Sequence, residues 1–320
     1  MFTDLPEAAL RTYRSAQVDP RDFDEFWATT LSTSREFDLG VSLTPVDTGL
    51  KTIDVWDVSF SGYGGQRVRA WLRVPAGATG PLPAVVNFVG YGGGRGNAAE
   101  SLFWASAGFA HLQMDTRGQG SAGSVGDTPD DAGSGPHGPG FMTRGIESRE
   151  SYYYRRVFVD AVRAVEAARS LPIIDATRVS VVGGSQGGGI ALAVAGLVDD
   201  LAAVAASVPF LCDFPRAVTM TDNDPYREIG RYLAVHRRSA DRTLETLSYF
   251  DGVNFAKRAT ASAILSTALM DPICPPSTVF AAYANYAGPK QITVWPFNGH
   301  EGGGIEDELL ALRHFDSTVR

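Results

Sequence analysis

The segment from Arg178 to Leu192 constrains the fold of this chain more than any other. It reads RVSVVGGSQGGGIAL, so an apolar run ends in Gly-x-Ser-x-Gly and continues into a second apolar stretch. A strand, a sharp turn at Ser185 and a helix explain this pattern, because small residues at Gly183 and Gly187 avoid collisions at the turn. Such a turn presents a serine hydroxyl at the edge of a sheet. A plain tight turn is the alternative interpretation.

The rest of the chain alternates apolar strands with helical patterns. Nearly continuous apolar runs are typical of strands buried on both faces, and they occupy 84–89, 179–182, 203–208 and 263–269. Helical spacing of apolar residues covers 151–170, 186–197, 278–286 and 305–315. Alternating residues from 53 to 74, across a glycine-rich turn, predict an antiparallel hairpin. The order predicts a doubly wound, mostly parallel α/β sheet.

Three segments lie outside this alternation. Residues 1–50 are predicted to form an N-terminal helical arm, 121–145 a long functional loop, and 214–250 a small helical cap or interface insertion. The arm carries an apolar stripe that we expect to pack on the core: Phe23, Phe26, Trp27 and Leu31. A length of 320 residues allows two domains, but the candidate site described below draws on most of the chain. We therefore expect a single domain over 1–320.

Charge and hydropathy exclude several classes of protein. Lys and Arg number 28 and Asp and Glu 36, which gives a net charge of −8 and argues against nucleic acid or an anionic membrane as partner. The longest apolar stretch, 189–208, is interrupted by Asp199 and Asp200, so no membrane span is expected. The first residues lack the pattern of a signal peptide, and we expect a cytoplasmic protein. Cys212 and Cys274 are too few for a disulfide scaffold or a zinc site.

A serine hydroxyl becomes a nucleophile when a histidine, oriented by a carboxylate, takes its proton. His300 is the candidate base, because it follows the predicted strand 291–297 and lies in the glycine-flanked loop Asn-Gly-His-Glu-Gly-Gly-Gly. The other four histidines fit less well: His111 and His137 precede Ser185, His236 lies in the cap, and His314 lies on the last helix.

Asp271 is the candidate acid. It directly follows the apolar strand 263–269 and Met270, and it precedes the rigid turn Pro-Ile-Cys-Pro-Pro, which would fix its carboxylate. Its place between Ser185 and His300 matches the order Ser, acid, His of α/β-hydrolases. The alternative is a capping role, which is common for Asp. The competing acids lack a preceding apolar strand: Asp213, Asp222, Asp224 and Asp251.

An acyl-transfer site also needs two backbone donors for the developing oxyanion. One is expected from Gln186, the residue after the serine, and the other from Tyr91 in the glycine-rich loop after strand 84–89. The Tyr91 ring would line the acyl pocket or, alternatively, support the core. This loop has no phosphate-binding lysine and no dinucleotide fingerprint, so no cofactor is expected, and no metal is needed.

Three motifs, read together, resemble the signature of the acetyl xylan esterase and cephalosporin C deacetylase family of carbohydrate esterases. They are Arg117-Gly-Gln-Gly120, Gly183-Gly-Ser-Gln-Gly187 and His300-Glu301. Supporting segments lie at 22–27, 89–96, 209–213 and 270–278, so the likeness covers nearly the whole chain.

The resemblance implies an α/β-hydrolase fold and a serine esterase that removes acetyl groups from small acetylated substrates. These would include acetylated xylo-oligosaccharides, cephalosporin C and simple acetate esters. It implies the triad Ser185, Asp271 and His300, with Tyr91 and Gln186 in the oxyanion hole. It also implies a homohexamer built as a trimer of dimers. Further roles implied by the resemblance are structural support from Arg117 and Gln119, and an acyl pocket near Phe210 and Cys274.

Two other functions remain open from the sequence. A serine peptidase of the prolyl-oligopeptidase type uses a similar Gly-Gly-Ser turn, although it usually carries a large additional domain. A non-catalytic binding protein on the same fold is the second, since a fold does not dictate a function.

Overall fold

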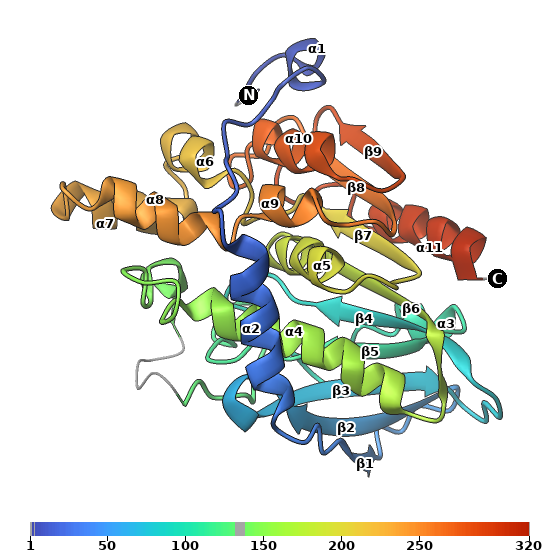
Figure 1. Ribbon diagram of the computed structural model, residues 1–320. Coiled ribbons are helices and arrows are strands. Elements are labelled where there is room, and N and C mark those ends of the chain that lie inside the picture. Colours follow the sequence, from blue (N-terminus) through green and yellow to red (C-terminus); the bar gives the residue numbers. More distant parts are fainter. Residues whose placement is uncertain (1, 3, 132–137, 320) are drawn as a thin grey trace.

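A computed structural model describes residues 2, 4–131 and 138–319. Its strands are β1 Ser42–Val46, β2 Ile53–Ser61, β3 Arg67–Pro75, β4 Leu82–Phe88, β5 Ala110–Met114, β6 Ile174–Gly184, β7 Ala203–Ser207, β8 Ser262–Ala268 and β9 Lys290–Trp295. They form one sheet in the order β1-β2-β3-β5-β4-β6-β7-β8-β9, which Figure 1 shows from bottom to top. Every neighbouring pair from β5 to β9 is parallel, so the predicted sheet is confirmed.

The antiparallel end of the sheet contains one strand that the sequence analysis missed. The predicted hairpin is present as β2 and β3, which pair in antiparallel register from Ile53 to Ser61. Residues 42–46, which we expected within a helical arm, instead form β1 and pair with β2. Most of β1 is exposed and it contains Pro45, so its residues show little of the alternation that marks a half-buried strand.

Helices cover both faces of the sheet. They are α1 Glu7–Leu10, α2 Phe23–Arg35, α3 Phe103–Ser106, α4 Tyr153–Ser170, α5 Gln186–Leu197, α6 Phe214–Met220, α7 Tyr226–Val235, α8 Ala240–Ser248, α9 Gly252–Ala256, α10 Pro276–Asn285 and α11 Ile305–Val319, with 3-10 turns η1 Tyr63–Gly65 and η2 Phe141–Thr143. The four helices predicted by spacing correspond to α4, α5, α10 and α11. In Figure 1, α2, α4 and α5 lie in front of the sheet.

Each face of the sheet has its own core. Adjacent residues of β4 show this, because Val86 belongs to the core under α2, α4 and α5, whereas Val85 belongs to the core under α3 and α11. Both side chains are fully buried, which explains the continuous apolar runs of the parallel strands. In the second core, the Trp104 ring stacks on Phe315 with centroids 5.2 Å apart.

The arm joins the first core through α2. Trp27 is only 2% exposed, and its indole N–H donates a 2.9 Å hydrogen bond to the Tyr249 carbonyl at the end of α8. Phe23 packs edge-on against Phe255 of α9. The predicted apolar stripe therefore packs on the core as expected.

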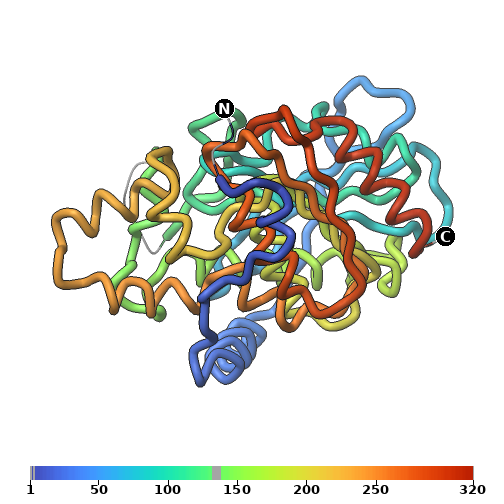
Figure 2. The backbone as a smooth tube through the Cα atoms, turned by 90° about the horizontal axis from the view of Figure 1, so that it is seen from above, coloured from blue at the N-terminus to red at the C-terminus, as the bar shows by residue number. Residues whose placement is uncertain are grey.

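The insertion 214–250 is helical, as predicted, and consists mainly of α6, α7 and α8. It lies in the chain between β7 and β8, which are parallel neighbours in the sheet. Both views show α7 and α8 projecting beyond the body of the molecule (Figures 1 and 2).

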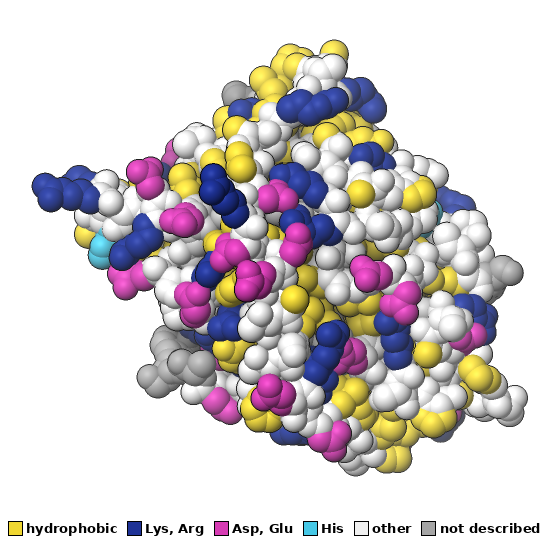
Figure 3. Space-filling view, viewed as in Figure 1, with side chains coloured by type: hydrophobic (Ala, Val, Ile, Leu, Met, Phe, Trp, Pro, Cys, Tyr) yellow, Lys and Arg dark blue, Asp and Glu magenta, His cyan; other side chains and the backbone are white. Residues whose placement is uncertain are grey.

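Charged side chains of both signs are spread over the surface of this net-acidic chain (Figure 3). Acidic and basic side chains lie interspersed over the face shown in Figure 3. Among the helices of the described residues, none combines the length and hydropathy needed to cross a bilayer.

Candidate active site

The predicted sharp turn lies between β6 and α5. Ser185 has φ +54° and ψ −121°, a strained conformation for a residue with a side chain. Its backbone is held on both sides, because its N–H donates to the Ser207 carbonyl and its own carbonyl accepts the Phe210 N–H, each at 2.9 Å. The strain is therefore maintained by β7 and the segment after it.

Two glycines allow this turn to pack. A Cβ built on Gly187 would lie 2.1 Å from the Phe88 carbonyl oxygen of β4, and one on Gly183 would lie 2.2 Å from the Gly187 backbone. Gly184 differs, since its nearest neighbour would be 3.9 Å away. The close approach of β4, β6 and α5 thus requires glycine at positions 183 and 187 but does not require it at position 184.

Replacing Gly187 with alanine is expected to lower the free energy of unfolding by about 3 kcal/mol, because the methyl group overlaps rigid backbone. The matched variant Gly184→Ala adds a methyl group that makes only an ordinary contact of 3.9 Å, so it should cost less than about 1 kcal/mol. Urea unfolding followed by circular dichroism compares the two. Equal urea midpoints for both variants would show that the close contact between residue 187 and the Phe88 backbone does not determine the loss of stability.

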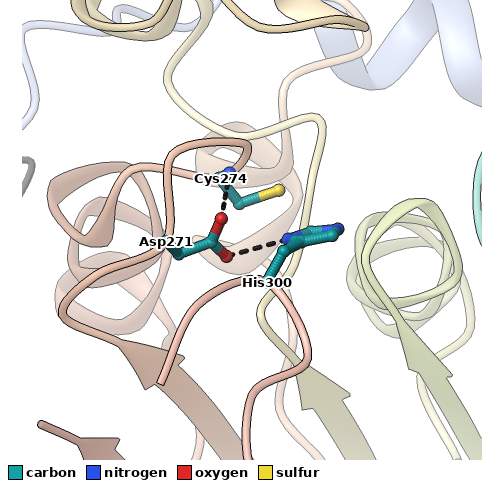
Figure 4. Close-up of side chains that lie close together, drawn as sticks. All are labelled: Asp271, Cys274 and His300. Atoms are coloured by element: carbon teal, nitrogen blue, oxygen red, sulfur yellow. Dashed lines mark hydrogen bonds and ion pairs between the residues drawn. The ribbon is translucent and has the colours of Figure 1, made fainter. Parts of the chain in front are cut away.

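Three side chains from three different loops meet at this turn. The Nε2 atom of His300 lies 2.9 Å from the Ser185 hydroxyl, and its Nδ1 lies 2.8 Å from Oδ2 of Asp271. Figure 4 shows Asp271, from the loop after β8, pointing at the imidazole of His300. The sequence predicted these three residues, and the structure brings them into one hydrogen-bonded chain.

Asp271 is held by its own turn. It is fully buried, and its Oδ1 accepts the N–H groups of Ile273 at 2.8 Å and Cys274 at 3.0 Å. Oδ2 is thereby directed at His300. The capping role considered for this aspartate and its contact with the histidine thus occur together, on different oxygens.

Asp271, Cys274 and His300 also offer atom types that bind metals, within 4.8 Å of one another. Burial raises the pKa of the Cys274 thiol well above its usual range, and the nearby Asp271 carboxylate raises it further. A cysteine binds a metal as the thiolate, which this burial disfavours. Both Asp271 oxygens already accept hydrogen bonds. The donor set therefore fits a histidine oriented by a carboxylate better than a metal site.

The two residues expected to donate to the oxyanion, Gln186 and Tyr91, lie in the segments that follow β6 and β4. Gln186 is the first residue of α5, where backbone N–H groups have no partner within the helix and the helix dipole favours negative charge. Tyr91 lies in the loop after β4, and β4 contacts the turn through Phe88. The carboxamide of Gln119 links the two regions, since its oxygen accepts the Gly92 N–H at 2.7 Å and its nitrogen donates to the Gln186 side chain at 2.9 Å.

Tyr91 is also held by α7 of the insertion 214–250. Its hydroxyl donates a 2.6 Å hydrogen bond to the buried Glu228 carboxylate of α7, and the same carboxylate accepts the N–H groups of Gly140 and Met142. Burial raises the pKa of Glu228. The ring packs edge-on against Phe210 and Phe141, so it supports the core around the site.

Arg117 lies behind this region. It is 1% exposed and donates to both oxygens of the buried Asp160 carboxylate on α4. Asp160 in turn accepts the Tyr63 N–H at 2.8 Å. Arg117 thus ties β5 to α4 and η1 without touching Ser185, which agrees with the structural support expected for it.

A cleft of about 340 Å³ opens at Ser185 and His300. Asn87, Trp104 and Ser207 contribute to its wall, and Glu301 and Glu308 line it beside His300. Tyr91, Phe210 and Cys274, which we expected near the acyl pocket, do not line this cleft. Phe210 and Cys274 are completely buried, so they lie behind the surface of the cleft rather than on it.

Three other histidines, all among the described residues, lie outside this arrangement. His111 is buried in β5, where burial and the nearby Arg73 lower its pKa to about 3, so it is a neutral core residue. His236 is exposed and stacks on Tyr232 in the cap, and His314 lies on α11. His137 falls outside the described residues.

Several residues of the site were not predicted. Glu228 lies in a polar helix whose sequence gives no sign of burial. The hydroxyls of Tyr153 and Tyr154 reach Gln119 and Gln186, and the run of three tyrosines at the start of α4 was a signal for them. Glu308 belongs to an acidic first turn that resembles an ordinary helix start.

Comparison with known proteins gives matches along the whole length of the chain. Acetyl xylan esterase from Paenibacillus sp. R4 has 39% sequence identity and a TM-score of 0.91, covering 98% of this chain and 100% of that one. Acetyl xylan esterase 1 from Thermoanaerobacterium sp. JW/SL YS485 has 33% identity and a TM-score of 0.89, covering 98% and 99%.

A curated relative, acetyl esterase Axe7A of Xylanibacter ruminicola, is 31% identical over 289 residues. The match spans 88% of this chain and 64% of that protein, so the relative is considerably longer. The family model for acetyl xylan esterase (AXE1) matches residues 1–313. With its α/β-hydrolase fold and this match, the chain belongs to the acetyl xylan esterase family, a family of carboxylic ester hydrolases.

Proposed function

We propose that this protein is a serine esterase that removes acetyl groups from small acetylated substrates through an acetyl-serine intermediate. Its substrates would be acetylated xylo-oligosaccharides, cephalosporin C and simple acetate esters. The observation that carries the proposal is the position of His300, with one ring nitrogen 2.9 Å from Ser185 and the other 2.8 Å from Asp271.

In the first half of the reaction, the Ser185 Oγ forms a bond to the acetyl carbonyl carbon while His300 Nε2 accepts the hydroxyl proton. The carbonyl oxygen becomes an oxyanion, which the N–H groups of Gln186 and Tyr91 stabilise. Collapse of this intermediate breaks the bond to the alcohol oxygen, and His300 gives its proton to that oxygen. The alcohol leaves, and the acetyl group remains on Ser185.

In the second half, water attacks the acetyl carbon and His300 accepts a proton from it. The second tetrahedral intermediate releases acetate, and the proton returns to Ser185. Asp271 keeps Nδ1 of His300 protonated throughout and stabilises the imidazolium, so Nε2 is free to accept. No step requires a metal or an organic cofactor.

We expect a preference for acetyl over longer acyl groups, and measuring it tests the proposed substrate class. This preference is supported by family membership. We expect kcat/KM for p-nitrophenyl esters to fall by about 100-fold from acetate to octanoate, because a small pocket excludes added methylenes. Comparable values for the two esters would argue against an acetyl esterase.

We also propose that the protein assembles as a homohexamer and acts in the cytoplasm. The hexamer is suggested by the similarity of the motifs to those of the family. Separately, the net charge of −8 gives no reason to expect nucleic acid or an anionic membrane as a partner. Light scattering coupled to size exclusion distinguishes a hexamer of about 205 kDa from a monomer of 34.2 kDa.

A further inference from the structure

Glu228, on α7 of the insertion 214–250, is a buried carboxylate that takes no part in the proton transfers. It is only 6% exposed. Its Oε1 accepts the Tyr91 hydroxyl at 2.6 Å and the Gly140 N–H at 3.0 Å, and its Oε2 accepts the Met142 N–H at 3.1 Å. Burial of a carboxylate costs free energy unless donors compensate it, so the charge and these three donors fix one another's positions.

The Tyr91 side chain connects Glu228 to the turn that carries the nucleophile. Its hydroxyl donates to Glu228 and accepts the Phe141 N–H of η2 at 3.0 Å. Its ring packs edge-on against Phe141 and Phe210, with centroids 5.3 Å and 6.2 Å away. The Phe210 N–H in turn donates to the Ser185 carbonyl at 2.9 Å. A side chain held at its tip by α7 therefore packs on a residue that supports the turn at Ser185.

The N–H expected to face the oxyanion belongs to the peptide that joins Gly90 to Tyr91. A Cβ built on Gly90 would meet nothing within 4 Å, so packing does not fix the backbone on that side, and glycine allows many backbone conformations. The carbonyl of the same peptide accepts the Gly93 N–H at 3.1 Å, which is a bond within the same tight turn. The direction of this N–H therefore depends on how Tyr91 itself is held.

The backbone after Tyr91 is held from a different side. The Gly92 N–H donates to the Gln119 carboxamide at 2.7 Å, and the Gly92 carbonyl accepts the Gly120 N–H at 3.0 Å. Because the Tyr91 Cα is tetrahedral, fixing both the following peptide and the side chain also fixes where its nitrogen lies. The contacts of Gly92 fix the first of these directions, and Glu228 fixes the second.

We infer that Glu228 is a positioning residue of the esterase: by holding the Tyr91 hydroxyl, it sets the position of the Tyr91 N–H that stabilises the oxyanion. The inference rests on the proposed function and extends it to the insertion, which would otherwise be remote from the chemistry. The ester oxygen gains its negative charge only in the transition state, so the effect should appear in kcat and leave ester binding nearly unchanged.

Two substitutions break the bond between Glu228 and Tyr91 from opposite ends. In Glu228→Gln, the NH₂ group of the amide must face the N–H of either Gly140 or Met142, whichever way it turns, so the set of three acceptor contacts cannot be kept. Tyr91→Phe removes the hydroxyl and keeps both the ring and the backbone N–H. In each variant kcat for p-nitrophenyl acetate should fall by about tenfold to thirtyfold, with KM within about threefold of the wild type.

A trifluoromethyl ketone gives a second readout, which a simple loss of stability would not change. The Ser185 Oγ adds to its carbonyl carbon, the hydroxyl proton passes to His300, and the carbonyl oxygen becomes an oxyanion. The inhibition constant should rise by about tenfold in each variant, in parallel with the fall in kcat. Rates are expressed per active site, counted after complete labelling with a fluorophosphonate, so unfolded protein does not contribute.

The double variant tests whether the two residues act together. Because both substitutions break the same bond, the double variant should have a kcat within about twofold of the slower single variant. Two matched controls lie in the same insertion. Tyr232→Phe removes an exposed hydroxyl of α7, and Glu245→Gln removes an exposed charge of α8. Each should keep kcat within about twofold of the wild type.

A kcat for Tyr91→Phe within about twofold of the wild type would overturn the inference and leave the esterase in place. So would losses that multiply in the double variant, or a fall in kcat with an unchanged inhibition constant for the ketone. Tyr91→Phe decides the question even if Glu228→Gln does not fold, because it leaves the contacts of Glu228 with Gly140 and Met142 intact. Failure of the proposed function looks different: Ser185→Ala would then retain hydrolysis, and the inference would fall with it.

Discussion

Replacing Ser185 with alanine should lower kcat for p-nitrophenyl acetate by about 10⁴-fold or more. The reason is that the Ser185 hydroxyl is the atom placed 2.9 Å from His300 Nε2, at the start of α5 and at the wall of the cleft. Without it the site keeps His300 and the proposed oxyanion donors, so only the residual rate due to binding and electrostatics remains. Initial rates at saturating ester measure the effect.

The matched control is Ser317→Ala, an exposed serine of α11 whose hydroxyl donates a hydrogen bond to the His314 carbonyl of the same helix. It should retain the wild-type rate within about twofold. Hydrolysis by Ser185→Ala at a rate near that of the wild type would mean that another group performs the attack.

Replacing Asp271 with asparagine should lower kcat by about 10⁴-fold while the fold is kept. The asparagine oxygen can still accept the N–H groups of Ile273 and Cys274, so its NH₂ group is turned toward His300 Nδ1. An NH₂ donor at Nδ1 stabilises the tautomer with the proton on Nε2, which cannot accept the Ser185 proton. The loss should therefore appear in kcat rather than in KM.

Asp199→Asn, an exposed residue after α5, is the control for a general effect of lost negative charge, and it should leave kcat unchanged. Thermal unfolding of Asp271→Asn separates loss of chemistry from loss of structure. A variant that keeps its melting temperature and also its activity would contradict the role of Asp271 in orienting His300.

The parts of this protein with strong local signals were predictable. The strand, turn and helix around Ser185 follow from an apolar run, two required glycines and a second apolar run. Asp271 and His300 could be selected because each follows a predicted strand, and parallel strands place their carboxyl ends at one edge of the sheet.

The parts that depend on distant contacts were not predictable. β1 exists because it pairs with β2, and its exposed residues leave no apolar alternation in the sequence. Glu228 becomes buried only where α7 meets Tyr91 and η2, which is a contact across 137 residues. Glu308 likewise lines the cleft because α11 packs beside the His300 loop, and a helix that begins with three acids looks the same whether or not a site is beside it.

The most direct test of the central claim is to locate the nucleophile by mass spectrometry after labelling with a fluorophosphonate probe. Only a serine activated by a neighbouring base should react rapidly with such a probe. The account predicts one label per chain, on the peptide that contains Ser185, and no label on Ser185→Ala. A label on a different residue, or an unlabelled protein that still hydrolyses p-nitrophenyl acetate, would contradict it.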